Sequence, residues 1–184
     1  MDHQQNIDTG IENFTIRFAD QADVPLILHF IQQLAEYENL SDEVVATEEG
    51  LRESLFEQRH AEVIIGEYDD QPVTFALFFH NYSTFLGKAG IYLEDLYVHP
   101  DMRGKGIGKS MLAYLAKLAV ERNCGRLEWS CLDWNEPSIQ FYKKLGAVPM
   151  DEWTVYRVDR ANLQALADSF GQQQVRKQAK EGIS

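Results

Sequence analysis

The sequence is poor in cysteine, and its few cysteines form no recognisable pattern. Cys124 and Cys131 are the only two in 184 residues, and they lack both a Cys-x-x-Cys spacing and a neighbouring histidine cluster. We interpret them as small, buried apolar side chains. The sequence therefore predicts neither a disulfide nor a bound metal.

Long apolar runs are missing as well. No stretch approaches the roughly 20 apolar residues that cross a bilayer, and residues 1–10 are polar, without the apolar core of a signal peptide. The composition, 45% hydrophobic and 25% charged, is typical of a globular domain. These features predict a cytoplasmic protein with no membrane partner.

Basic residues are scarce relative to acidic ones. The chain has 17 Lys and Arg against 29 Asp and Glu, a formal net charge of -12. Phosphate backbones bind to basic surfaces, so this balance argues against a nucleic-acid partner, whereas it suits a cationic substrate.

The order of the predicted elements indicates a mixed α/β fold. Strands are expected where β-branched and aromatic residues cluster, and helices where apolar residues recur at helical spacing. The predicted strands are 15–19, 61–68, 73–82, 91–98, 126–132 and 154–158; the predicted helices are 20–38, 47–56, 108–122, 136–145 and one capped by Asp159. We predict a single domain over residues 14–170, with polar, mobile termini at 1–13 and 171–184.

A glycine-rich turn, Arg103-Gly104-Lys105-Gly106-Ile107-Gly108, joins the strand at 91–98 to the following helix. Glycines let a ligand approach the backbone closely, and the first N–H groups of a helix attract anions. A P-loop would need glycine at Arg103, and a GxGxxG motif would need glycine at Lys109, so neither motif is present. The turn predicts a phosphate or pyrophosphate site, with a ligand-free turn as the alternative.

Two sequence blocks resemble a known superfamily. The R-G-x-G-I-G turn after Tyr92–Val98 is similar to the coenzyme A signature of GNAT acetyltransferases, and Trp134–Ala147 resembles the late helix of that superfamily. With Glu36-Tyr37-Glu38, residues 14–166 resemble the diamine (spermidine/spermine) and thialysine acetyltransferase branch. The resemblance implies a GNAT-like α/β fold, with a splayed, mixed, mostly antiparallel sheet flanked by helices, and a homodimer.

The resemblance also implies acetyl-CoA as the acetyl donor. Its pantetheine arm would pair with one strand as though with another strand, its pyrophosphate would lie on the glycine turn, and Tyr142 would lie near the thioester sulfur. The implied cofactor-binding residues are Leu96, Tyr97, Val98, Arg103, Gly104, Lys105, Gly106, Ile107, Gly108, Lys109, Asn135 and Ser138.

Transfer of an acetyl group to an amine needs a proton acceptor and a proton donor. An alkyl ammonium has a pKa of about 10, so the site must first remove a proton. Period-two alternation puts Glu94 on one face of its strand and Asp95 on the other. We expect burial to raise the pKa of Glu94 and make it the general base, the alternative being a buried ion pair; Asp95 is a structural acid or a substrate anchor. Tyr142 is the candidate acid for the departing thiolate, the alternative being a packed aromatic residue.

The acids also bear on the substrate. Glu38 matches the amine-binding acid of the resembled branch, but Phe85 stands where that branch often has tryptophan. A short diamine or an aminoalkyl amino acid such as thialysine is therefore as plausible as a long polyamine. The alternatives are a peptide or protein N-acetyltransferase, which needs an open groove, and a non-catalytic coenzyme A sensor.

Overall fold

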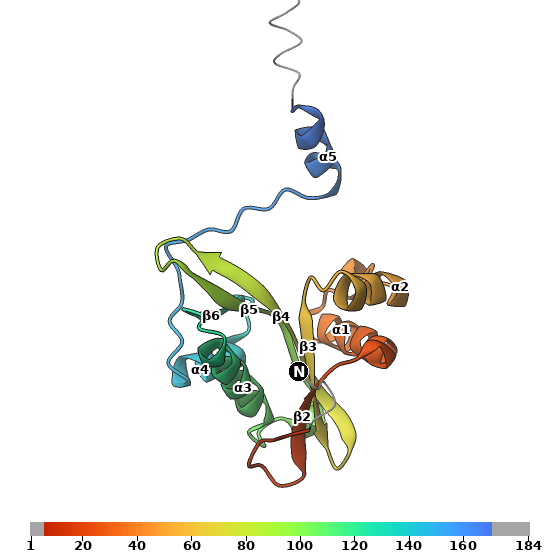
Figure 1. Ribbon diagram of the computed structural model, residues 1–184, viewed down its shortest axis with the longest axis vertical. Helices are drawn as coiled ribbons and strands as arrows, with labels where there is room; N and C mark the ends of the chain where they lie inside the picture. Colours follow the sequence, from red (N-terminus) through yellow and green to blue (C-terminus); the bar gives the residue numbers. More distant parts are fainter. Residues whose placement is uncertain (1–5, 171–184) are drawn as a thin grey trace, which may run out of the picture. The chain divides into compact units, whose positions relative to one another are not determined.

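The computed structural model describes residues 6–170 (Figure 1), and the terminus predicted at 171–184 lies outside them. The described chain divides after Leu132 into two compact units, each of which is considered by itself. No helix in the described part is both long enough and apolar enough to cross a membrane.

A six-stranded sheet forms the centre of the first unit. Its strands lie in sequence order, and every neighbouring pair is antiparallel except β5 and β6, which are parallel. The strands are β1 (Ile7–Asp8), β2 (Phe14–Phe18), β3 (Glu62–Tyr68), β4 (Gln71–Ser83), β5 (Lys88–Val98) and β6 (Leu127–Trp129). The predicted mixed, mostly antiparallel sheet flanked by helices is confirmed.

Helices cover both faces of this sheet. α1 (Val24–Glu38) and α2 (Glu48–Leu51) lie on one face, and α3 (Ile107–Glu121) lies on the other (Figure 1). The buried Phe30 of α1 packs on the sheet: its ring stacks on that of Phe75, with the ring centroids 5.3 Å apart, and lies 5.7 Å from the centroid of the Tyr97 ring. The shorter helices are η1 (Gln21–Asp23), η2 (Ser41–Glu43), η3 (Arg52–Glu57), which is a π-helix, and η4 (Pro100–Met102).

The second unit contains α4 (Glu136–Lys144) and α5 (Arg160–Asp168), both predicted from the sequence. The predicted strand at 154–158 is wrong, because no strand within residues 6–170 pairs with this segment. Val155 and Tyr156 are 81% and 92% exposed there. Alternating β-branched residues favour a strand only where a neighbouring strand offers hydrogen bonds. Asp159 holds the N-cap position of α5, but its side chain makes no capping hydrogen bond.

The amino-terminal segment also differs from expectation. Residues 7–13 are not a mobile tail, because β1 pairs with β2 and places Ile7 opposite Ile16. Strand pairing uses backbone groups, so a segment with few apolar side chains can still join a sheet edge.

Candidate active site

A β-bulge in β5 sets the geometry of the acidic residues. Leu77 of β4 lies opposite Asp95 and Phe78 lies opposite Leu93, so Glu94 has no partner across β4. An extra residue of this kind breaks the alternation of side chains along its strand. Simple alternation predicted that Leu93, Asp95 and Tyr97 share a face; Asp95 and Tyr97 do, but Leu93, opposite Phe78, lies on the other face.

Cross-strand pairs show which residues share a face after the bulge. Phe75, Leu77 and Phe79 alternate along β4, and their partners on β5 are Tyr97, Asp95 and Tyr92. Paired residues of antiparallel strands lie on the same side of a sheet. Asp95 therefore projects toward the α1 face, on the same side as the tyrosines that flank it in β5.

Three carboxylates interact on this side of the first unit. Burial, together with the smaller effects of the negative charges of Glu94 and Glu38, raises the pKa of Asp95 to about 6. Burial also raises the pKa of Glu38, the last residue of α1. The two segments that carry the predicted substrate acids thus come close enough for their charges to interact.

Glu94 itself does not have the predicted environment. Its side chain is exposed at the bulge, so the expectation that burial would tune this carboxylate is wrong. The half-buried group is Asp95, whose pKa is raised into the range where a carboxylate exchanges protons near neutral pH.

The glycine turn has the backbone geometry of an anion site. Gly104 and Gly106 have φ angles of 77° and 85°, in the left-handed region that favours glycine. Gly106 is the N-cap of α3, and the N–H of Ser110 donates to its carbonyl oxygen at 2.9 Å. The amides at 107–109 come before that first bond, and no side chain caps them. They are available to a pyrophosphate.

The two cations of the turn fold back onto the protein. Nε of Arg103 donates to the carbonyl oxygen of Val98 at 3.1 Å, and its guanidinium lies 4.6 Å from the ring centroid of Tyr37. Nζ of Lys105 lies 5.5 Å from the centroid of the Tyr68 ring. Arg103 thus links the turn to the end of β5 and to the residue that precedes Glu38 in α1. Sequence reasoning had not assigned a function to Tyr37, although it belongs to the Glu36-Tyr37-Glu38 segment.

The edge of β5 opens beside the turn. β6 pairs in parallel with β5 only from Ile91 to Leu93, and beyond Leu93 no strand within residues 6–170 pairs with this edge. The predicted pantetheine-binding residues, Leu96 to Val98, lie on this unpaired stretch. The side chain of Tyr97 is buried in the core, so only its backbone fits that role.

The remaining predicted residues belong to the second unit. Asn135 is the N-cap of α4, and its Oδ1 accepts a hydrogen bond from the Ser138 N–H at 3.4 Å. Tyr142 lies one turn beyond Ser138 on the same helix and is half-buried. Its ring centroid is 5.4 Å from that of Phe141. The predicted grouping of Ser138 and Tyr142 on one helix face agrees with this helix.

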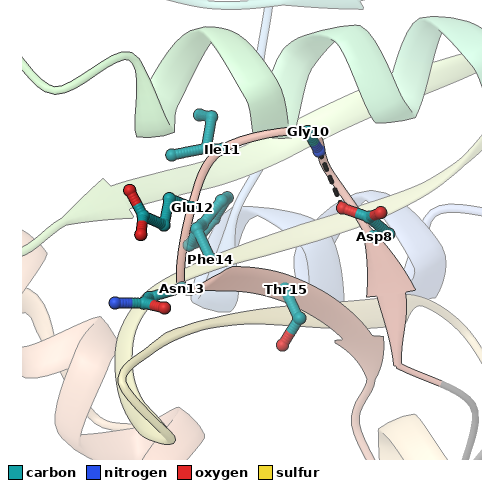
Figure 2. A pocket seen from close by; sticks show the side chains of 7 residues that line it. All are labelled: Asp8, Gly10, Ile11, Glu12, Asn13, Phe14 and Thr15. Carbon is teal, nitrogen blue, oxygen red and sulfur yellow. Dashed lines mark hydrogen bonds between the residues drawn. The ribbon is translucent and has the colours of Figure 1, made fainter.

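Two cavities in the described part of the chain are lined by other residues. One, of about 400 Å³, is lined by residues between β1 and β2, including Ile11, Glu12 and Asn13 (Figure 2). The other, of about 350 Å³, lies between α1 and the segment after it and includes Gln33 and Val44. Neither is lined by a predicted site residue. No cluster of acidic, histidine or cysteine side chains in the described part of the chain is arranged to hold a metal ion.

An anion site at a glycine turn, an unpaired strand edge and a set of carboxylates together suit an enzyme that binds an anionic cofactor and a cationic substrate. The Acetyltransferase (GNAT) family matches residues 30–147, more than half of the chain. This chain belongs to that family, as the sequence motifs had indicated.

Individual relatives agree with this assignment. The chain is 37% identical over 164 residues to a thialysine N-epsilon-acetyltransferase of Bos taurus, with 83% of this chain and 96% of the relative covered. It is 33% identical over 205 residues to an L-ornithine N5-acetyltransferase of Arabidopsis thaliana, with coverage of 86% and 90%. Among solved structures, an integron cassette protein from the mobile metagenome of V. cholerae superposes with a TM-score of 0.72 at 29% identity, covering 85% of this chain and 99% of that one.

Proposed function

We propose that this chain transfers an acetyl group from acetyl-CoA to a primary amine of a small cationic substrate. The observation that carries the proposal is a group of three acids: Glu38 at the end of α1, and Glu94 and Asp95 in β5, the strand that leads into the glycine turn. Acetyl-CoA supplies the activated thioester, and the residues of the chain bind and orient the two substrates and move protons.

The acids favour a substrate with more than one ammonium group, or with an ammonium group on an amino acid. Asp95 lies half-buried between the charges of Glu94 and Glu38, so a bound cation relieves their mutual repulsion. Glu38 ends α1, where the helix dipole is negative and also attracts a cation. The relatives named for thialysine and L-ornithine support an aminoalkyl amino acid in particular.

We propose different roles for the two neighbouring acids. Asp95, on the α1 face, holds the ammonium group, while Glu94, exposed to water, accepts its proton directly or through a water molecule. The raised pKa of Asp95 shows that ionising this side chain is already costly without a cation beside it. When charged, both carboxylates attract the ammonium group, and the proton that leaves the amine passes to Glu94.

The proposed cofactor contacts use the glycine turn and the unpaired edge of β5. The amides at 107–109 and the turn cations would hold the pyrophosphate, and the backbone of Leu96 and Val98 would pair with the pantetheine arm. From the family resemblance we assign cofactor binding to Asn135 and Ser138 as well, and donation of a proton to the departing thiolate to the Tyr142 hydroxyl. The roles in α4 rest on the family resemblance.

A panel of amines tests the proposal directly. Thialysine, ornithine, 1,3-diaminopropane, spermidine, propylamine and a short peptide would each be assayed for thiol release from acetyl-CoA. We expect turnover with the dicationic or zwitterionic amines and little with propylamine or the peptide. Turnover of the peptide alone would support a protein N-acetyltransferase, and coenzyme A binding without turnover of any amine would support a sensor.

We also propose that the protein is a cytoplasmic homodimer. The dimer follows from the resemblance to the diamine acetyltransferase branch and the compartment from the sequence composition. Light scattering of the purified chain would give the oligomeric state, and cell fractionation would give the compartment.

A further inference from the structure

The loop between β1 and β2 lies beside the glycine turn at 103–108. A Cβ atom placed on Gly106 would lie 3.7 Å from Cδ1 of Ile11, a normal van der Waals distance. Figure 2 shows Ile11 projecting from its loop toward the neighbouring helix, drawn in the green of α3. Ile11 therefore borders the glycine that begins α3.

Hydrogen bonds fix the position of this loop. The Thr9 hydroxyl donates to the carbonyl oxygen of Phe14 at 2.7 Å and accepts from the Ile11 N–H at 3.2 Å. The Gly10 N–H donates to the Asp8 carboxylate at 2.9 Å, and the Phe14 N–H donates to the Ile11 carbonyl at 3.0 Å. Because Phe14 is 1% exposed, the loop is anchored in the sheet, and Ile11 projects from a fixed base.

The glycine turn also lies near the β3–β4 turn, which is hydrogen-bonded to the β1–β2 loop. The Asp69 N–H, in the turn between β3 and β4, donates to the carbonyl oxygen of Asn13 at 3.0 Å. The neighbouring residue Tyr68 carries the ring over which Nζ of Lys105 lies. Two consecutive residues of the glycine turn thus lie beside two segments that are hydrogen-bonded to each other. Lys105 lies over Tyr68 of the β3–β4 hairpin, and Gly106 lies beside Ile11 of the β1–β2 loop.

A turn with two glycines at positive φ has little conformational restraint of its own. Its amides bind an anion well only if they already point toward one place, because ordering a flexible site reduces its affinity. Within residues 6–170 no side chain caps the start of α3, so contacts with neighbouring segments restrain the turn. Ile11 lies where it can supply that restraint.

We propose that Ile11 is a positioning residue for the pyrophosphate of acetyl-CoA. By packing against Gly106 it holds the amides at 107–109 in the orientation that receives the anion. The inference rests on the proposed use of acetyl-CoA, and it concerns a residue outside the stretch 30–147 that the family matches.

The test compares two acyl donors in the full-length enzyme. S-acetylpantetheine carries the same thioester as acetyl-CoA but has no pyrophosphate and no nucleotide. Ile11→Ala should lower kcat/KM for acetyl-CoA by about threefold to tenfold, as expected for a site that has lost preorganisation, with an unchanged value for S-acetylpantetheine. Ile11→Val, which keeps the branched side chain, should restore most of the loss.

Ile7→Ala is the matched control, because Ile7 lies in the same hairpin and pairs with Ile16 rather than contacting Gly106. It should leave both donors unchanged. Calorimetry with coenzyme A gives an independent measurement, in which Ile11→Ala should weaken binding by the same factor. Equal losses with both donors, or unchanged coenzyme A affinity, would overturn the inference. A wild-type chain that fails to bind coenzyme A would instead refute the proposed function.

Discussion

Replacing Asp95 with Asn should make the protein more stable above pH 6 while impairing its activity. The pKa of Asp95 rises from the ordinary 3.8 to about 6 in the folded chain, a change of about 2 units. At about 1.4 kcal/mol per unit, ionising Asp95 therefore costs the folded state up to about 3 kcal/mol. Because the folded pKa is higher than the unfolded one, the wild-type chain loses this free energy as pH rises from about 4 to about 6.

Urea unfolding at pH 4 and pH 8 measures the effect. At each pH the unfolding free energy of wild type is subtracted from that of Asp95→Asn. This difference should be about 1 to 3 kcal/mol larger at pH 8 than at pH 4. This comparison cancels the part of the difference that does not depend on pH. The same variant should lose about tenfold or more in kcat/KM for a diamine at pH 8, because the ammonium group loses its carboxylate partner.

Asp42→Asn, at an exposed site in η2, is the control and should show no such change between the two pH values. If Asp95→Asn shifts stability equally at pH 4 and pH 8, the carboxylate is not desolvated in the folded protein. If the diamine is still turned over at the wild-type rate, Asp95 does not hold the substrate.

Three further substitutions test the proposed site. Tyr142→Phe should lower kcat by about 100-fold with little change in the calorimetric affinity for acetyl-CoA; an unaltered rate with chemistry limiting would exclude Tyr142 as the acid. Gly106→Val should weaken coenzyme A binding, because a branched residue is strained at a φ of 85° and its side chain would block access to the amides, and calorimetry on the folded variant would show it. Glu38→Gln should raise KM for 1,3-diaminopropane more than for propylamine, and this preference should shrink with added salt; equal effects on both amines would contradict an acidic amine site.

The sequence predicted those parts of the fold that depend on local chemistry. The glycine turn was placed correctly, because its left-handed backbone at Gly104 and at Gly106, the N-cap of α3, favours glycine. The helix predicted at 47–56 begins at Thr47, whose hydroxyl accepts from the Gly50 N–H at 3.1 Å. The strands predicted at 61–68 and 73–82 left a short connection, in which Asp69 and Asp70 have the positive φ of a tight hairpin turn.

The errors lie where tertiary context decides. Residues 154–158 alternate like a strand but have no partner strand in the described chain, while the polar residues before Phe14 include a paired strand. Neither outcome can be read from side-chain pattern, because pairing depends on which backbone edges meet. The bulge at Glu94 was missed for the same reason, and with it the fact that Asp95 is the half-buried acid of the pair.

That single unpaired residue changes which residue numbers of β5 face each of two hydrophobic cores. Before the bulge, odd-numbered residues such as the buried Ile91 and Leu93 point away from α1; after it, the odd-numbered Tyr97 packs beneath α1. Deleting Glu94 would leave Leu93 and Asp95 opposite their present partners, Phe78 and Leu77, so Tyr97 would stay in its core and Asp95 would stay on the α1 face. The pairing of β4 with β5 therefore does not require a residue at position 94, and the bulge adds an exposed carboxylate next to Asp95 without changing the packing on either face.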